Sequence, residues 1–194
     1  MTTDPLRAFL DGLAEFGREH DAHETEHARR LLNAGPEAGQ LLWILVRATR
    51  ARRILEIGTS NGYSTIWLAW AAGGTGGHVI TIDRAAAKVA MARENLQRAG
   101  LVDRVTLLEG AALAILAGLD GPFEFVFLDA DRPNYLAYVD PLLSLVPPGG
   151  LLATDNVLSH ARELQGYLHR LTRDPGLVSV TLPVGNGVLL TYKR

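Results

Sequence analysis

The sequence contains no cysteine, and this absence removes several kinds of site at once. A chain of 194 residues without a thiol has no disulfide, no thiolate metal site and no cysteine nucleophile. Such a composition is compatible with the reducing cytoplasm. The formal net charge is only −2 and no run of Lys or Arg stands out, so nucleic acid is not expected as a partner.

Long apolar runs are lacking as well. No segment approaches the roughly 18 consecutive apolar residues that a membrane span requires, and the first residues lack a basic region followed by an apolar stretch. We therefore expect a soluble, unprocessed, cytoplasmic protein that meets no membrane. The length suits a single domain with one substantial core.

Short apolar segments instead alternate with amphipathic ones along most of the chain. A helical region is predicted from Asp4 to about Arg50, with a third helix opening after Pro36. Strands are predicted over 53–57, 78–83, 105–109, 123–128, 151–155, 178–182 and 188–192, and helices over 64–72, 85–99, 112–116, 134–146 and 162–173. This order predicts an α/β fold with a mostly parallel sheet, helices on both faces and an antiparallel C-terminal hairpin.

The most informative motif is a glycine turn after the first predicted strand. The strand ends after Glu56, the chain turns from Gly58 to Gly62, and a helix follows. Glycines let the backbone bend with positive φ, and the helix N-terminus offers free N–H groups to a nucleotide-like ligand. A dinucleotide fingerprint needs glycine where this loop has Ser60, which disfavours NAD and FAD. Asp83, at the end of the second strand, can accept the hydroxyl protons of a ribose or cap the next helix.

Polar side chains also follow two later strands. Asp129 ends one predicted strand, and Asp155 and Asn156 end the next. Parallel strands place their carboxyl ends at one edge of a sheet, where α/β proteins bind ligands. Two carboxylates and the carbonyl of Asn156 form an all-oxygen set that suits Mg²⁺, Mn²⁺ or Ca²⁺. The alternative is that these residues only form turns and caps.

Several segments, taken together and in this order, carry a resemblance to a known family. They are Pro36-Glu-Ala-Gly-Gln-Leu-Leu, Leu55-Glu-Ile-Gly-Thr-Ser-Asn-Gly-Tyr-Ser, Glu109-Gly-Ala-Ala-Leu, Leu128-Asp-Ala-Asp-Arg-Pro-Asn-Tyr and Asp155-Asn-Val-Leu. From Pro36 onward the chain resembles the cation-dependent O-methyltransferases of the caffeoyl-CoA and catechol group, which are class I S-adenosylmethionine enzymes. The resemblance implies a Rossmann-like, seven-stranded methyltransferase domain over residues 1–194, with a helical cap over 1–50 and a donor-binding core over 51–194.

The resemblance also implies a role for particular residues. The implied contacts to S-adenosylmethionine are Glu56, Gly58, Thr59, Ser64, Asp83, Ala112 and Asp131. A divalent cation, Mg²⁺ before Mn²⁺ or Ca²⁺, would be held by Asp129, Asp155 and Asn156. Catalysis would involve Asp129, Arg132 and His160, with His160 touching a small, phenolic or catechol-type acceptor. Members of this family are usually homodimers, so the resemblance also implies a homodimer.

Arg132 departs from the family pattern, which usually has lysine there. Arginine stays protonated and cannot act as a general base, so it would stabilise the acceptor's negative charge or simply pair with a carboxylate. Deprotonation would then fall to the metal, to water or to His160, because histidine exchanges protons near neutral pH. The chain between Asn156 and His160 leaves little room for a long insertion, which makes an acyl-CoA acceptor less favoured.

Other functions stay open at this point. They are a methyltransferase of the same fold without metal dependence or with a non-phenolic acceptor, an NAD-type oxidoreductase, and a non-catalytic cofactor-binding module. His23-Glu24-Thr25-Glu26-His27 also matches a zinc protease motif, although its charged neighbours favour a solvated segment. Trp43, Trp67 and Trp70 are expected in the core, whereas Tyr135 and Tyr138 fit a pocket or the core equally well.

Overall fold

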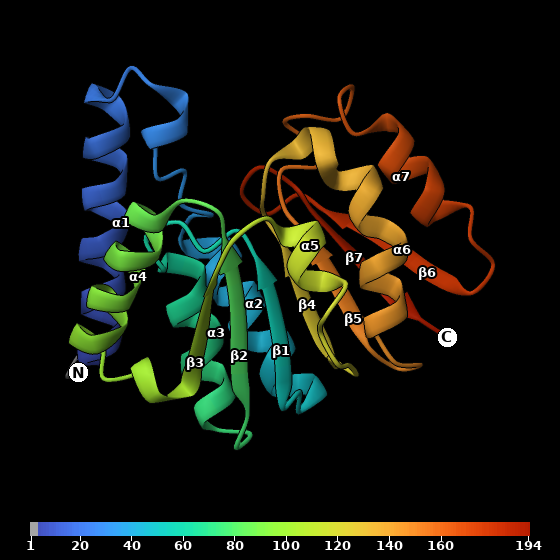
Figure 1. The fold of residues 1–194 in the computed structure, drawn as a ribbon, viewed down its shortest axis with the longest axis horizontal. Coiled ribbons are helices and arrows are strands. Elements are labelled where there is room, and N and C mark those ends of the chain that lie inside the picture. Colours follow the sequence, from blue (N-terminus) through green and yellow to red (C-terminus); the bar gives the residue numbers. More distant parts are fainter. Residues whose placement is uncertain (1–3) are drawn as a thin grey trace.

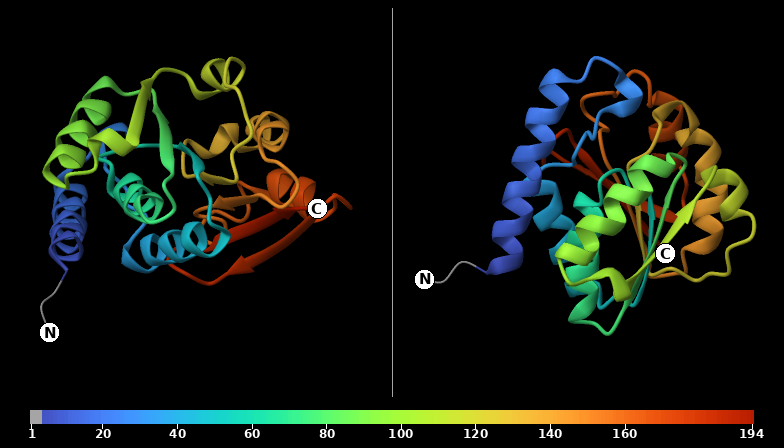
Figure 2. Two further views of the ribbon diagram at one scale, coloured as in Figure 1. Left: turned by 90° about the horizontal axis from the view of Figure 1, so that it is seen from below. Right: turned by 60° about the vertical axis from the view of Figure 1, so that its left-hand side comes forward.

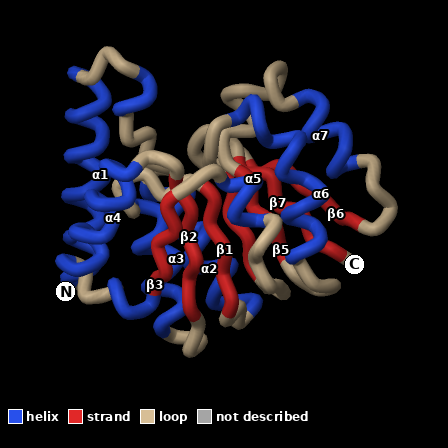
Figure 3. Tube along the Cα trace, viewed as in Figure 1, coloured by secondary structure: helices blue, strands red, loops and turns tan. Residues whose placement is uncertain are grey.

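The computed structural model describes residues 4–194 and is built around one seven-stranded sheet (Figures 1 and 3). The strand order is β3-β2-β1-β4-β5-β7-β6, with β7 antiparallel to both of its neighbours and the other neighbouring strands parallel. The strands are β1 (Arg53–Ile57), β2 (His78–Asp83), β3 (Val105–Glu109), β4 (Phe125–Leu128), β5 (Leu151–Thr154), β6 (Leu177–Leu182) and β7 (Val188–Lys193). The predicted α/β architecture and its antiparallel hairpin are therefore confirmed.

Helices cover both faces of the sheet (Figure 2). They are α1 (Pro5–His23), α2 (Pro36–Thr49), α3 (Tyr63–Gly73), α4 (Ala86–Arg98), α5 (Ala112–Leu116), α6 (Tyr135–Leu145) and α7 (Gln165–Thr172). Consecutive side chains of β4 enter opposite cores: Phe125 packs with α2 and α3, whereas Val126 packs with α6 and α7. Within residues 4–194, no helix is both long and apolar enough to cross a membrane.

The carboxyl edge of the sheet contains the point where the strand order reverses. From β1 the chain moves outward through β2 to β3 and then returns to β4, on the other side of β1. Such switch points are where open α/β sheets bind ligands. The ladder extends past the strands here, because Asp129 N–H donates to the Ile57 carbonyl at 2.9 Å and Asp155 N–H donates to the Leu128 carbonyl at 3.0 Å.

Two segments differ from the expected helices. Residues 24–35 interrupt the predicted helical region and contain only a short 3-10 turn, His27–Arg29. Residues 157–164 form turns, so α7 begins at Gln165 rather than at Arg162. At the start of the second segment, the N–H groups of Val157 and Leu158 donate to carbonyls of the β6–β7 turn, at 3.0 and 3.1 Å.

Candidate active site

A cleft of about 1290 Å³ opens at the carboxyl edge of the sheet. The glycine turn after β1 and the β2–α4 connection form one half of its wall, and the ends of β4 and β5 form the other. The segment between α1 and α2 also lines it. The predicted site residues that line the cleft are Gly58, Thr59, Ser64, Asp83, Ala112, Asp129, Asp131, Arg132, Asp155, Asn156 and His160.

Gly58 brings the two halves of the wall together. Its φ is +103°, and a Cβ placed on it would lie 2.0 Å from the carbonyl oxygen of Asp129. Any side chain would therefore push the loop after β1 away from the loop after β4. Glycine is required here for contact between two protein loops, a reason that the sequence alone did not reveal.

Asp83 and Asp131 supply carboxylates to the half of the cleft next to the glycine turn. Asp83 accepts hydrogen bonds from the N–H groups of Ser60 and Ala85, at 2.8 and 2.9 Å. Asp131 accepts from the hydroxyl of Tyr138 at 3.2 Å, and Tyr138 also lines the cleft. Because a carboxylate has about four acceptor positions, Asp83 keeps capacity for a ligand's hydroxyl groups.

Glu56 is fully buried and does not line the cleft. Its carboxyl group accepts hydrogen bonds from the hydroxyls of Ser64, Thr65 and Thr81. Burial raises the pKa of Glu56 to about 7, although these hydroxyls oppose the shift. In this arrangement Glu56 supports Ser64, which does reach the cleft, and its direct contact with the donor stays a prediction.

Asp129, Asp155 and Asn156 converge at the other half of the cleft. The amide Nδ2 of Asn156 donates to Asp129 Oδ1 at 2.8 Å, and the backbone N–H of Asn156 donates to Asp155 Oδ1 at 2.8 Å. Asn156 adopts a left-handed φ of +67°, which turns the chain directly after Asp155. The neighbouring strand ends therefore bring the three predicted oxygen ligands together.

The charges in this cluster favour a cation. Burial, followed by the charge of Asp155, raises the pKa of Asp129 well above its ordinary range, and burial raises that of Asp155 to about 6. A divalent cation would stabilise both carboxylates in their ionised form. Among residues 4–194, no three His, Asp or Glu side chains converge on a metal position, so Asn156 has to complete the set. A half-turn of its amide would present Oδ1 beside Asp129 in place of Nδ2.

Arg132 lies beside this cluster and is paired with a carboxylate. Its Nε lies 3.3 Å from Oε2 of Glu163, and both residues line the cleft. The charge of Arg132 partly opposes the rise in the pKa of Asp129. Ser159 Oγ lies 2.8 Å from His160 Nδ1, and His160 lines the same half of the cleft. Pairing with a carboxylate, one of the two roles expected for Arg132, is thus present.

The zinc motif does not form a metal site in this structure. Helix α1 ends at His23, and His27 begins a separate 3-10 turn, so the two histidines do not share the helical face that such a site needs. Trp67 is buried as expected, and Tyr135 packs in the core on the opposite side of the sheet. Tyr138 therefore reaches the cleft, whereas Tyr135 does not line it.

Comparison with known proteins now adds to this geometry. The family model described as O-methyltransferase matches residues 13–194. The chain belongs to the O-methyltransferase family. A catechol O-methyltransferase of Mycobacterium tuberculosis is 46% identical over 123 residues, which span 63% of this chain and 56% of that protein. Another catechol O-methyltransferase, from Niastella koreensis, is 36% identical over 83% of this chain and 69% of its own length.

Solved structures of the O-methyltransferase family agree with the fold. The O-methyltransferase TomG from Streptomyces achromogenes, solved in complex with SAM, superposes with a TM-score of 0.83 and is 30% identical. The match covers 100% of this chain and 91% of TomG. This agreement extends from α1 to the C-terminal hairpin.

Several cleft residues of this O-methyltransferase were missed by sequence reasoning. Glu163 and Asn186 line the cleft, and the amide of Asn186 donates to Asn156 Oδ1 at 3.2 Å. Asp21, Ser60 and Lys88 hold the N-terminal part of the wall. Ser60 lies inside the glycine turn, but nothing in the sequence indicates that its hydroxyl binds residue 31. The other four residues lie in turns or on helix faces, and no motif in the sequence marks them.

Proposed function

We propose that the protein transfers the methyl group of S-adenosylmethionine to a hydroxyl of a small, catechol or phenolic acceptor, assisted by a divalent cation. The observation that carries this proposal is the oxygen cluster of Asp129, Asp155 and Asn156, which faces the same cleft as the glycine turn. The names of the relatives support methyl transfer to oxygen, and TomG was solved with SAM. A nucleoside donor and a chelating acceptor would thereby meet in one cavity.

The donor half would hold the nucleoside and the sulfonium group. Asp83 would accept the ribose hydroxyl protons, while Gly58 and Thr59 would present the backbone of the glycine turn. Asp131, held by Tyr138, would attract the donor's ammonium group. Each of these groups is already fixed by protein hydrogen bonds or by loop contacts, so little reorganisation is needed when the donor binds.

The acceptor half would hold the hydroxyl that is methylated. When bound at Asp129, Asp155 and Asn156, the cation would supply Lewis-acid stabilisation of an ionised acceptor oxygen and orient the acceptor. Arg132 carries a permanent positive charge beside this position and cannot accept a proton. His160 lies in the same part of the cleft and can take up the proton that the acceptor hydroxyl loses. Fixing both substrates in one cleft supplies the proximity that the transfer needs.

A methyltransferase of the same fold without metal dependence is the second candidate. The hydrogen bond between Asn156 and Asp129 favours it, because this amide satisfies one carboxylate oxygen without a cation. Assembly as a homodimer also belongs to the proposal, on the strength of the family resemblance.

A catechol panel incubated with S-adenosylmethionine and Mg²⁺ tests the function. We expect mass spectrometry to detect a product that is heavier by one methylene unit, and we expect EDTA to abolish its formation. Full turnover in EDTA would select the metal-independent candidate. No methylated product with Mg²⁺, Mn²⁺ or Ca²⁺, despite bound donor, would contradict methyl transfer to catechols.

A further inference from the structure

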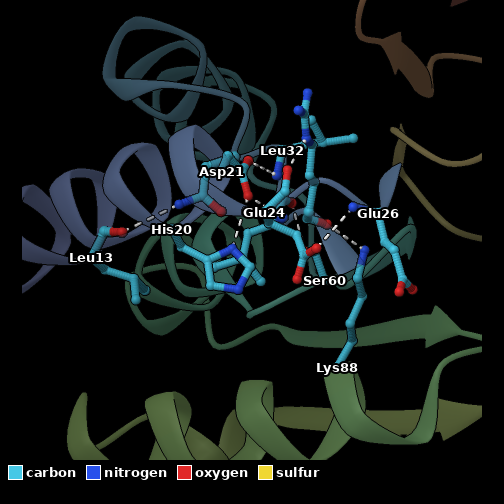
Figure 4. Close-up of polar contacts among 11 residues, drawn as sticks. Leu13, His20, Asp21, Glu24, Glu26, Leu32, Ser60 and Lys88 are labelled. Atoms are coloured by element: carbon cyan, nitrogen blue, oxygen red, sulfur yellow. Dashed lines mark hydrogen bonds and ion pairs between the residues drawn. The ribbon is translucent and has the colours of Figure 1, made fainter. Parts of the chain in front are cut away.

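The segment between α1 and α2, residues 24–35, forms a strap along the cleft. Figure 4 shows polar contacts around it, with Asp21, Ser60 and Lys88 labelled. His27, Leu31, Leu32 and Asn33 are among its residues that line the cavity. Apart from the 3-10 turn at His27–Arg29, the strap has no regular structure. Its position therefore depends on individual attachments to the rest of the protein.

Asp21, in the last turns of α1, makes the first attachment. Its Oδ1 accepts the N–H of Leu31 and its Oδ2 accepts the N–H of Leu32, both at 2.7 Å. These are short hydrogen bonds to a charged group, the stronger class in proteins. Leu32 has a φ of +50°, a conformation that non-glycine residues rarely adopt, so the carboxylate holds the strap in a bend that the chain does not favour.

Asn33 adds a hydrogen bond from its amide to the Leu13 carbonyl of α1 at 3.3 Å, and two further attachments come from the donor half of the cleft. Ser60, inside the glycine turn, donates its hydroxyl to the Leu31 carbonyl at 2.6 Å. Lys88, on α4, donates its ammonium group to the Arg30 carbonyl at 2.8 Å. The peptide unit that follows Arg30 is thus held from both sides, since Asp21 binds the N–H of Leu31 and Lys88 binds the Arg30 carbonyl.

Ser60 connects the strap to a residue of the donor site. Its backbone N–H donates to Asp83 Oδ2 at 2.8 Å, and its hydroxyl binds the strap. Ser60 also has a left-handed φ of +48°, which directs these two groups to different partners. Asp83 and the strap are therefore linked through one residue, in the position where dinucleotide-binding loops have glycine.

We propose that Asp21 and Ser60 are positioning residues that hold residues 24–35 closed over the donor and thereby set how fast the donor and its product exchange. This inference rests on the proposed function for the identity of the donor. The strap has to leave Asp21, Ser60 and Lys88, and Asn33 has to leave the Leu13 carbonyl, before the cleft opens along residues 24–35. Weakening any one attachment raises the fraction of molecules in which the strap is detached.

Trypsin cleavage after Arg29 and Arg30 measures detachment without any ligand. The side chain of Arg29 is 67% exposed, and cleavage still requires the strap to leave the protein surface. Asp21→Asn, Ser60→Ala and Lys88→Met are each expected to raise the initial cleavage rate by roughly tenfold, because each removes a hydrogen bond to the strap. The same variants should release radiolabelled S-adenosylhomocysteine faster by a similar factor in a chase experiment.

Glu19→Gln provides the matched control, since Glu19 is an exposed carboxylate on α1 that does not line the cleft. Its cleavage and release rates should stay within about twofold of the wild type. Lys88 belongs to α4, so faster cleavage in Lys88→Met cannot be explained by a substitution within α1 or the glycine turn that misfolds either segment. Unchanged cleavage in all three variants, or faster cleavage with unchanged release, would overturn the proposal. Failure of the wild type to bind S-adenosylhomocysteine would overturn the proposed donor, while the cleavage rates would still report on the attachments.

Discussion

Replacing Asp155 with asparagine is expected to lower kcat/KM for methyl transfer by at least about 100-fold. Asparagine keeps the size of the side chain but removes one of the two carboxylates that would hold the cation and ionise the acceptor. The affinity for S-adenosylhomocysteine should change by less than about threefold, because other residues form the donor half of the cleft. Initial rates by mass spectrometry and calorimetric titration of S-adenosylhomocysteine measure the two effects.

The expected loss of activity in Asp155→Asn can be distinguished from a loss of folding, because the charges around Asp155 predict that the variant remains stable. Asp129 and Asp155 are adjacent carboxyl groups whose pKa values are raised, so losing one of them removes a repulsion in the metal-free protein. In EDTA, Asp155→Asn should be at least as stable to urea as the wild type. Asp103→Asn is the control, because Asp103 is exposed and does not line the cleft. Equal kcat/KM in both variants would contradict a role for Asp155.

The second large effect concerns Glu56 and the pH dependence of stability. In the folded protein the pKa of Glu56 is raised to about 7 from 4.5, mainly by burial. Between these two pH values the folded state keeps a proton that the unfolded state has released. Stability is therefore lost as pH rises from about 4.5 to about 7, by roughly 3 kcal/mol for this one group. The glutamine in Glu56→Gln stays neutral at every pH, so this variant does not undergo this loss of stability as pH rises.

Urea unfolding of both proteins at about pH 5 and about pH 8 isolates the effect, because other ionisable groups cancel in the difference. The free energy of unfolding of Glu56→Gln, relative to that of the wild type, should be higher at about pH 8 than at about pH 5 by roughly 2 to 3 kcal/mol. The hydroxyls of Ser64, Thr65 and Thr81 can rotate to accept the new amide N–H groups. A difference between the two proteins that is the same at both pH values would show that Glu56 ionises normally.

The sequence predicted the sheet well because its strands are short, apolar and bounded by glycine or charged residues. The bounds 53–57, 78–83 and 105–109 agree with β1, β2 and β3. The hairpin was also predictable, since a turn of five residues cannot cross over to a parallel strand. In the site, the meeting of Asp129 with Asp155 followed from their places at the ends of neighbouring parallel strands.

The sequence could not predict the two segments whose backbone is held by distant partners. Residues 24–35 give two N–H groups to Asp21 and two carbonyls to Ser60 and Lys88, so local helical preference does not decide their structure. Residues 157–159 donate their N–H groups to carbonyls of the β6–β7 turn in the same way. Glu163 and Asn186 enter the cleft from these late turns, and no local pattern marks them.

Binding of Mn²⁺ followed by electron paramagnetic resonance tests the central claim most directly, since it asks whether the cluster at the ends of β4 and β5 holds a cation. In the presence of S-adenosylhomocysteine and a catechol, the wild type should remove one equivalent of Mn²⁺ per chain from the free-ion signal. Asp155→Asn should leave that signal unchanged, while Asp103→Asn should behave like the wild type. Equal binding by all three proteins, or no binding by the wild type, would contradict a cation at Asp129, Asp155 and Asn156.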